Sequence, residues 1–325
     1  MTSPVFFWII SVKPFSLSES QNAEVRRSCQ TIALQIGLPD AASHTMVVSL
    51  WFAMPMATIS VTEDMATCMR LHAMGWRTAY HDETLALGLA NRILARVATR
   101  ILLSHEASLG HLPAAARERA VVTGNPIRPA VLNGDAARGR AAYRLEPGLP
   151  LVLVTGGASG AQQVNRMLTG ALPELLRHCQ VVHQCGSLSL AEMQQVAAQL
   201  PPQLAARYHV LDFIHDELPD LLAAADIVVA RSGAGTVAEL TALGKASILV
   251  PYPHSAGDEQ RITARHLADQ GAAVMLDGDR ATPDELRTAV TSLLADPHAR
   301  SAMSRAATAQ GRPDAAARVV TELLT

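Results

Sequence analysis

The sequence predicts an α/β protein in which residues 121–325 form one complete domain around a parallel sheet, with an atypical or partial N-terminal domain over residues 1–120. Two observations support this prediction. Beyond residue 120, short apolar runs alternate with helical stretches, which is the pattern of βαβ units with right-handed crossovers. A length of 325 residues is also more than one ordinary core requires, so it favours two domains.

Five apolar runs are predicted as strands of this sheet. Most are separated by stretches with helical spacing, such as residues 161–178. Open sheets of this kind bind ligands at the carboxyl ends of their strands. The loops expected to line a site therefore begin at Gly156, Gly186, Ile214, Ser232 and Pro253. The runs are LVLVTGG (151–157), QVVHQCG (180–186), YHVLDFI (208–214), DIVVARSG (226–233) and ASILVPYP (246–253).

The most distinctive loop is ARSGAGTVAEL, residues 230–240, which follows the apolar run 227–229. Small residues after a strand let a ligand approach the backbone, and the first amides of the next helix can bind a diphosphate. Thr236 and Glu239 are also spaced as a capping box, in which both side chains serve only the free amides of the helix itself. This stretch alone supports the two interpretations equally.

A second small-residue loop, GGASGA, follows the first predicted strand at residues 156–161. It differs from the GxGxxG pattern of dinucleotide-binding proteins, and it lacks the lysine of a phosphate-binding P-loop. Two such loops at the same edge of one sheet indicate a phosphate-containing ligand more strongly than either loop does alone.

Composition argues against several classes of function. The formal net charge of −2 gives no electrostatic reason to expect a nucleic-acid partner. The four cysteines form no CxxC pair, so we expect a reducing compartment and no metal site. The first residues lack the basic leader of a signal peptide. The apolar run 46–61 contains Pro55 and is shorter than a membrane-spanning helix, so we expect it to be buried or interfacial.

Taken together, the motifs and their order resemble the MurG family of bacterial N-acetylglucosaminyltransferases, from about Leu89 to the C-terminus. This family transfers GlcNAc from UDP-GlcNAc to undecaprenyl-linked muramoyl-pentapeptide in peptidoglycan synthesis. The resemblance implies a GT-B fold, in which two Rossmann-like domains face a cleft and the C-terminal one binds the donor nucleotide. The matching segments are GLANRILARVATRIL (88–102), VTGNPIR (122–128), VTGGASGAQQVN (154–165), VVHQCG (181–186), FIHDELPDLLAAADIVVARSGAGTVAEL (213–240), PYPHSAGDEQ (251–260) and PDAA (313–316).

The resemblance also implies roles for individual residues of a donor site. Arg128 would lie near the donor diphosphate, for which a guanidinium fork is a natural partner. Ile214 would contact the uracil, and Thr236 with the neighbouring amides would bind phosphate. Glu239 would accept hydrogen bonds from the ribose hydroxyls, and Gln260 would bind the hydroxyls of GlcNAc. No metal or other cofactor is implied, because helix amides and the guanidinium stabilise the departing diphosphate.

Two departures from the family pattern fall inside this site. The family has serine in its Gly-Gly-Ser loop where this chain has Ala158, so Ser159 is left as the hydroxyl expected to contact phosphate. The family's Asp-His-Gln near the sugar is Asp258-Glu259-Gln260 here, which keeps the amide and changes its neighbour. We therefore expect donor binding to be retained and to be weaker.

Residues 1–88 contain no counterpart of the family's Gly-Gly-Thr-Gly-Gly-His loop, which faces the lipid-linked acceptor and carries the histidine favoured as general base. Residues 60–90 instead resemble the cellulose-synthase-like transferases of the GT-A class. In that class the aspartate of Thr-Glu-Asp, here Asp64, is the catalytic base, although the supporting aspartate pair and Gln-x-x-Arg-Trp motif are missing. His81 is a second candidate for the base, because HDET (81–84) stands where the MurG family has His-Glu-Gln-Asn.

Three hypotheses for function follow. The first is metal-independent, inverting transfer of GlcNAc to the lipid-linked acceptor by a protein bound peripherally to the cytoplasmic face of the inner membrane. The second is a UDP-GlcNAc-binding half-site that is inactive without a partner chain, or a chimeric or truncated gene product in which two unrelated folds meet near residues 88–91. The third is a remnant of a processive GT-A enzyme, which would require manganese.

Overall fold

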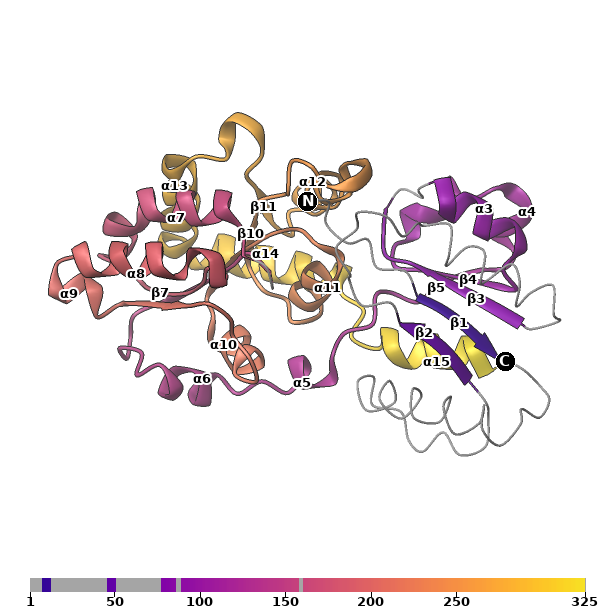
Figure 1. Cartoon of the computed structure of the whole chain (residues 1–325), viewed down its shortest axis with the longest axis horizontal. Helices are drawn as coiled ribbons and strands as arrows, with labels where there is room; N and C mark the ends of the chain where they lie inside the picture. The colour runs from indigo at the N-terminus through magenta and orange to yellow at the C-terminus, as the bar shows by residue number, and fades with distance from the viewer. Residues whose placement is uncertain (1–7, 13–45, 51–76, 86–88, 158–159, 325) are drawn as a thin grey trace. The chain divides into compact units, whose positions relative to one another are not determined.

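The computed structural model of the chain describes residues 8–12, 46–50, 77–85, 89–157 and 160–324 (Figure 1). Contacts divide the chain into two compact units. The first unit comprises Met1–Pro129, His254–Glu259 and Arg312–Thr325, and the second comprises Ala130–Pro253 and Gln260–Gly311. The predicted domain boundary near residue 120 stays a prediction. Among the described helices, none combines the length and the apolar character needed to traverse a bilayer.

The first unit contains a mixed sheet in the order β2-β1-β3-β4-β5. Strand β1 is antiparallel to β2 and β3, whereas β3, β4 and β5 are parallel to one another. Its elements are β1 (Trp8–Val12), β2 (Met46–Leu50), β3 (Arg77–Asp82), α3 (Leu89–Val97), β4 (Arg100–Leu103), the 3-10 helix η1 (Glu106–His111), α4 (Ala114–Arg117), β5 (Ala120–Val122) and α15 (Ala315–Leu324).

Regular alternation of strand and helix begins at β3, earlier than the sequence pattern indicated. The reason is element length, since β4 has four residues, β5 has three and α4 has four. A periodicity of 2 or 3.6 residues cannot be recognised over such short segments. The core of this unit includes Tyr80 from β3, Leu94 from α3 and Ile101 from β4, all buried.

The second unit contains a wholly parallel sheet in the order β11-β10-β9-β6-β7-β8. All five strands predicted from the sequence are confirmed, and each predicted run ends in a loop. The two-residue strand β11 was missed because it is too short to give a pattern. The strands are β6 (Leu151–Thr155), β7 (Gln180–Gln184), β8 (Tyr208–Leu211), β9 (Ile227–Ala230), β10 (Ser247–Leu249) and β11 (Val274–Met275).

Helices cover both faces of this sheet because successive strand side chains point to opposite sides. Val152 and Val154 of β6 belong to a core with α7 (Gln162–Leu175) and α13 (Pro283–Ala295). Leu151 and Leu153 belong to a second core with α10 (Leu218–Ala224) and α11 (Ala234–Ala242). The other helices between residues 129 and 310 are α5 (Pro129–Leu132), α6 (Ala136–Ala142), η2 (Ser187–Ser189), α8 (Leu190–Gln199), α9 (Pro202–Ala205), η3 (Ala256–Asp258), α12 (Glu259–Asp269), η4 (Gly278–Arg280) and α14 (Pro297–Gln310).

The strand order creates a topological switch point between β6 and β9. After β6 the chain adds β7 and β8 on one side, and it then crosses to build β9, β10 and β11 on the other side. The connections that follow β6 and β9 therefore leave in opposite directions, and crevices of this kind are where open α/β sheets bind ligands. Both small-residue loops recognised in the sequence lie at this point.

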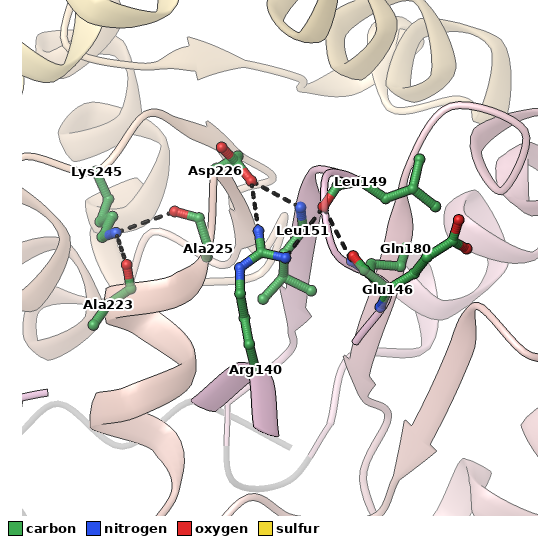
Figure 2. Close-up of polar contacts among 9 residues, drawn as sticks. All are labelled: Arg140, Glu146, Leu149, Leu151, Gln180, Ala223, Ala225, Asp226 and Lys245. Carbon is green, nitrogen blue, oxygen red and sulfur yellow. Dashed lines mark hydrogen bonds and ion pairs between the residues drawn. The ribbon is translucent and has the colours of Figure 1, made fainter. Parts of the chain in front are cut away.

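Polar side chains close the opposite, amino edge of the same sheet (Figure 2). Asp226, just before β9, accepts a hydrogen bond from the Leu151 amide at 2.8 Å and pairs with Arg140 at 3.6 Å. Lys245, just before β10, donates to two carbonyls at the end of α10, at 2.8 and 3.1 Å. Each of these contacts links the start of a strand to a neighbouring segment of the protein.

Candidate functional site

The helix that follows β9 begins at Ala234, and Gly233 is its N-cap residue. Because the N-cap is Gly233 and not Thr236, the interpretation of Thr236 and Glu239 as a capping box is wrong. Thr236 lies in the first turn and Glu239 in the second. The first intrahelical bond runs from Val237 N to Gly233 O at 2.9 Å, and the amides that precede Val237 have no acceptor within the helix.

The glycines of this loop are not required by the folded chain. A methyl group added at Gly233 or Gly235 would meet no atom within 4 Å, and Gly233 has a φ of −66°, which any residue can adopt. Glycine at such positions leaves the backbone accessible to a ligand. A helix N-terminus with open space before it is suited to bind an anion such as a diphosphate.

The loop after β6 has a different reason for its glycines. Gly160 has a φ of +72°, and a methyl group there would lie 2.3 Å from the carbonyl oxygen of Cys185. Gly157 also has a positive φ, of +81°, but a methyl group there would meet no atom within 4 Å. The fold therefore requires glycine at Gly160, where two loops touch. Ala158 and Ser159 lie outside the described residues, so the phosphate contact of Ser159 stays a prediction.

Arg231, which follows the last residue of β9, links three segments at this edge. Its Nη1 atom donates to Gln163 Oε1 at 2.9 Å and to the carbonyl oxygens of Val250 and Pro251 at 3.0 and 2.9 Å. The guanidinium also lies 5.4 Å from the centre of the Tyr252 ring. Burial lowers the pKa of Arg231 to about 10, so the group is still charged at neutral pH. A charged residue follows this strand because its guanidinium links α7 to the residues after β10, next to the loop that leads into α11.

Gln260 lies in the first turn of α12 and is only 8% exposed. Its Oε1 atom accepts a hydrogen bond from the Tyr252 amide at 3.0 Å, and its main-chain oxygen accepts from the Ser232 hydroxyl at 2.8 Å. These bonds fix the loop after β10 against the loop after β9. The predicted contact of Gln260 with a sugar therefore involves a side chain that already serves the structure.

The structure places the other predicted donor-site residues as follows. Ile214 comes three residues after β8, its side chain is 2% exposed, and its amide donates to Gln184 Oε1 at 2.9 Å. Ile214, Thr236, Glu239 and Gln260 all follow strands at the carboxyl edge of one sheet. Arg128 is exposed and belongs to the first unit.

His81, one of the two candidates for a catalytic base, is buried near the end of β3. Its Nε2 atom lies 2.9 Å from the carbonyl oxygen of Gly124, so this nitrogen carries the proton of a neutral ring. Burial lowers the pKa of His81, and its Nδ1 atom has no hydrogen-bond partner among the described residues. The imidazole is thus neutral, with an unprotonated Nδ1 atom, which is the form that can accept a proton. Asp64 lies outside the described residues.

A buried chain of hydrogen bonds that the sequence did not predict also ends at this edge. The Tyr208 hydroxyl lies 2.8 Å from His183 Nδ1, His183 Nε2 lies 3.0 Å from Asn165 Oδ1, and Asn165 Nδ2 donates to the Cys185 carbonyl at 3.0 Å. This order of donors and acceptors requires a neutral imidazole, and burial lowers the pKa of His183 to about 3. This series of hydrogen bonds fixes the carbonyl of Cys185, which lies against Gly160.

No group of three or more His, Cys, Asp or Glu side chains within the described ranges could bind a metal ion. The polar groups that the structure gathers at the carboxyl edge include backbone amides, small hydroxyls, amides of Gln, the Arg231 guanidinium and the Glu239 carboxylate. Such groups bind anions and hydroxyls.

Residues 151–319 match the model of the glycosyltransferase family 28 C-terminal domain. Several curated bacterial proteins named UDP-N-acetylglucosamine–N-acetylmuramyl-(pentapeptide) pyrophosphoryl-undecaprenol N-acetylglucosamine transferase are similar to the chain. The protein from Desulforudis audaxviator is 35% identical over 249 residues, which cover 74% of this chain and 65% of the relative. The protein from Rhodospirillum centenum is 40% identical over 251 residues, which cover 76% of this chain and 64% of the relative. The chain thus matches just under two thirds of the length of these relatives.

Solved structures agree with the fold. The crystal structure of MurG from Acinetobacter baumannii superposes with a TM-score of 0.62 at 25% identity, and the match covers 79% of this chain and 69% of the other. The UDP-GlcNAc 2-epimerase from Neisseria meningitidis, solved bound to UDP-GlcNAc, superposes with a TM-score of 0.60 at 15% identity, and the match covers 80% of this chain and 72% of the other. The second likeness concerns the fold alone.

Proposed function

The chain belongs to glycosyltransferase family 28 by its C-terminal domain, and we propose that it transfers GlcNAc from UDP-GlcNAc to undecaprenyl-linked muramoyl-pentapeptide. The observation that carries this proposal is the switch point of the parallel sheet. There, the open N-terminus of α11 and the glycine loop after β6 follow adjacent strands. An anion-binding helix end beside a close-packed glycine loop suits the diphosphate of a nucleotide sugar.

In this proposal each predicted donor-site residue has one role. The amides before Val237, with the Thr236 hydroxyl, bind the diphosphate, and Glu239 accepts hydrogen bonds from the ribose. Ile214 contacts the uracil through its main chain, because its side chain is buried. The remaining assignments are Gln260 to the GlcNAc hydroxyls, and Arg128 and Ser159 to the phosphates. These donors stabilise the negative charge of the departing UDP without a metal ion.

The acceptor hydroxyl must lose a proton when it attacks the sugar, so the enzyme needs a general base. We assign this role to His81 or Asp64. A neutral imidazole with a lowered pKa supports His81, since only the unprotonated ring can accept a proton. The lipid-linked acceptor requires that the protein work at a membrane surface, which we place at the cytoplasmic face of the inner membrane.

A second candidate function is a donor-binding half-site that a partner chain completes. One observation favours it: residues 1–88 contain no counterpart of the acceptor-facing Gly-Gly-Thr-Gly-Gly-His loop of the MurG family. The donor-binding residues would then be intact, and transfer would require the second polypeptide.

The experiment measures transfer of labelled GlcNAc from UDP-GlcNAc to a soluble lipid-linked muramoyl-pentapeptide analogue by the purified chain, with EDTA and with manganese. Product formed in EDTA is the expected result. A folded protein that binds UDP-GlcNAc but forms no product would identify the half-site instead. A folded protein that does not bind UDP-GlcNAc would contradict both functions.

A further inference from the structure

Gln184, the last residue of β7, joins the loops of both neighbouring strands. Its Nε2 atom donates to the Gly157 carbonyl, in the loop after β6, at 2.9 Å. Its Oε1 atom accepts from the Ile214 amide, after β8, at 2.9 Å. The side chain is 3% exposed, so these bonds lie inside the protein. One amide group thus uses its donor side for one loop and its acceptor side for the other.

Gln184 bonds the loop after β6 at a position that is open and the loop after β8 at a residue that is packed in the core. A methyl group at Gly157 would meet no atom within 4 Å, which means that no side chain packs against that position. The residues before Ile214, Asp212 and Phe213, are exposed. The side chain of Gln184 therefore ties the open position at Gly157 to the packed residue Ile214 through two directional hydrogen bonds.

We propose that Gln184 is a positioning residue for the donor nucleotide, which sets the distance between the loop that binds the base and the loop that binds the diphosphate. This assignment rests on the proposed function, in which Ile214 contacts the uracil and the loop after β6 contacts phosphate. With its amide donated to Gln184 and its side chain buried, Ile214 has its main-chain carbonyl left for a base. A carbonyl accepts the N3–H of uracil and repels the bare N3 of cytosine.

The same strand offers a matched control at its other end. Gln180, the first residue of β7, is 1% exposed and also uses both sides of its amide, which bond one segment, residues 146–149 (Figure 2). Its Oε1 atom accepts from the Glu146 amide at 2.8 Å, and its Nε2 atom donates to the carbonyls of Glu146 and Leu149, each at 3.0 Å. Residue type, strand and burial match those of Gln184, while the edge of the sheet differs.

The test compares Gln184→Glu and Gln184→Met with Gln180→Glu and Gln180→Met in the full chain. Glutamate keeps an acceptor for the facing amide but cannot donate, whereas methionine keeps the approximate volume and makes neither bond. Calorimetric titration with UDP and with CDP gives the two affinities, and thermal denaturation shows that each variant is folded. If one substitution prevents folding, the other at the same position carries the comparison.

We expect both Gln184 variants to bind UDP about tenfold more weakly than the wild type, and the Gln180 variants to bind it equally well despite a lower Tm. The preference for UDP over CDP should persist in Gln184→Glu and shrink in Gln184→Met. Wild-type UDP affinity in both Gln184 variants, or equal weakening in the Gln180 variants, would overturn the assignment. A UDP-over-CDP preference that is lost in Gln184→Glu, or that is unchanged in Gln184→Met, would overturn it as well. A wild-type chain that binds no UDP would overturn the proposed function itself, and this assignment with it.

Discussion

The two edges of the second unit's sheet use polar side chains for different purposes. At the amino edge, Asp226 and Lys245 bond main-chain groups of adjacent segments, and the contacts end within the protein (Figure 2). At the carboxyl edge, Gln184 and Arg231 also bond main-chain groups, but Gln184 fixes a loop in which Gly157 has open space around it. The same chemistry closes one edge and, in the proposed function, positions the loops of the other edge for a ligand.

This difference shows how a parallel sheet separates stability from function. All strands begin at one edge and end at the other, so residues that secure the first edge can be optimised without changing the loops of the second. Substitutions at the amino edge should therefore lower stability alone. Substitutions at the carboxyl edge should change ligand affinity, with or without a change in stability.

The largest expected effect is the acid sensitivity of the carboxyl edge. Burial holds the pKa of His183 at about 3, against an ordinary value of 6.5, so below pH 6.5 the unfolded chain takes up a proton that the folded chain does not. Stability is therefore lost as the pH falls from 6.5 towards 3, by roughly 1.4 kcal/mol per pH unit from this group. Urea denaturation between pH 4 and 7 gives the unfolding free energy at each pH. As the pH falls, this free energy should decline more steeply in the wild type than in His183→Gln, and the difference in slope should correspond to about one proton.

Measuring the protonation state of the His183 ring directly separates its contribution to acid sensitivity from that of titrating carboxylates. Nitrogen NMR of His183 at pH 5 should show a neutral ring with its proton on Nε2, the tautomer that the bond to Asn165 requires. An imidazolium signature at that pH would contradict the account, because both Tyr208 and Asn165 are placed for the neutral form.

The next effect compares two glycines with positive φ. Gly160→Ala combines a φ of +72° with a methyl group 2.3 Å from the Cys185 carbonyl, and it should cost about 2 to 4 kcal/mol of unfolding free energy and weaken UDP binding. Gly148, before β6 at the amino side, has a φ of +83° and open space. Gly148→Ala should cost about 1 kcal/mol, the conformational term alone, and leave UDP affinity unchanged. Equal losses in the two variants would show that loop contact at Gly160 is unimportant.

A smaller effect concerns two carboxylates. Glu239→Ala should weaken UDP-GlcNAc binding by about 1.5 to 3 kcal/mol, the range for a hydrogen bond to a charged group. Asp226→Ala removes an acceptor from the Leu151 amide and should lower the unfolding free energy without changing that affinity. Calorimetry and urea denaturation of both variants give the comparison. An unchanged affinity with a lowered Tm in Glu239→Ala would assign Glu239 to helix stability only.

Much of this comparison could be predicted from the sequence, because apolar runs that alternate with helical spacing fix the strands and their carboxyl ends. The five strands around residues 151–253, and both glycine loops, were located in this way. Their order in the sheet, and hence the switch point between β6 and β9, follows from pairing that no local pattern encodes.

The start of α11 and the polar network could not be predicted for a physical reason. The spacing of Thr236 and Glu239 fits a capping box, but Ser232 bonds the main chain of Gln260 and the helix begins three residues earlier than that motif requires. The sequence also gives no reason to distinguish Gln180 from Gln184, since both are glutamines at the ends of one apolar strand. Which partner each one finds depends on loops that are distant along the chain, and only the tertiary structure brings them together.

The smallest effect on stability gives the cleanest separation of the two roles. Gly235 lies in the first turn of α11, and a methyl group there would meet no atom within 4 Å. Alanine loses less backbone entropy than glycine on folding, so Gly235→Ala should raise the unfolding free energy by about 0.5 to 1 kcal/mol. In the proposed site the same methyl group would occupy the space where the diphosphate approaches the amides, so UDP affinity should fall. Urea denaturation and calorimetry on one sample give both values. A gain in stability with unchanged affinity would mean that the N-terminus of α11 does not contact the diphosphate, and the carboxyl edge would then resemble the amino edge more closely than its glycines suggest.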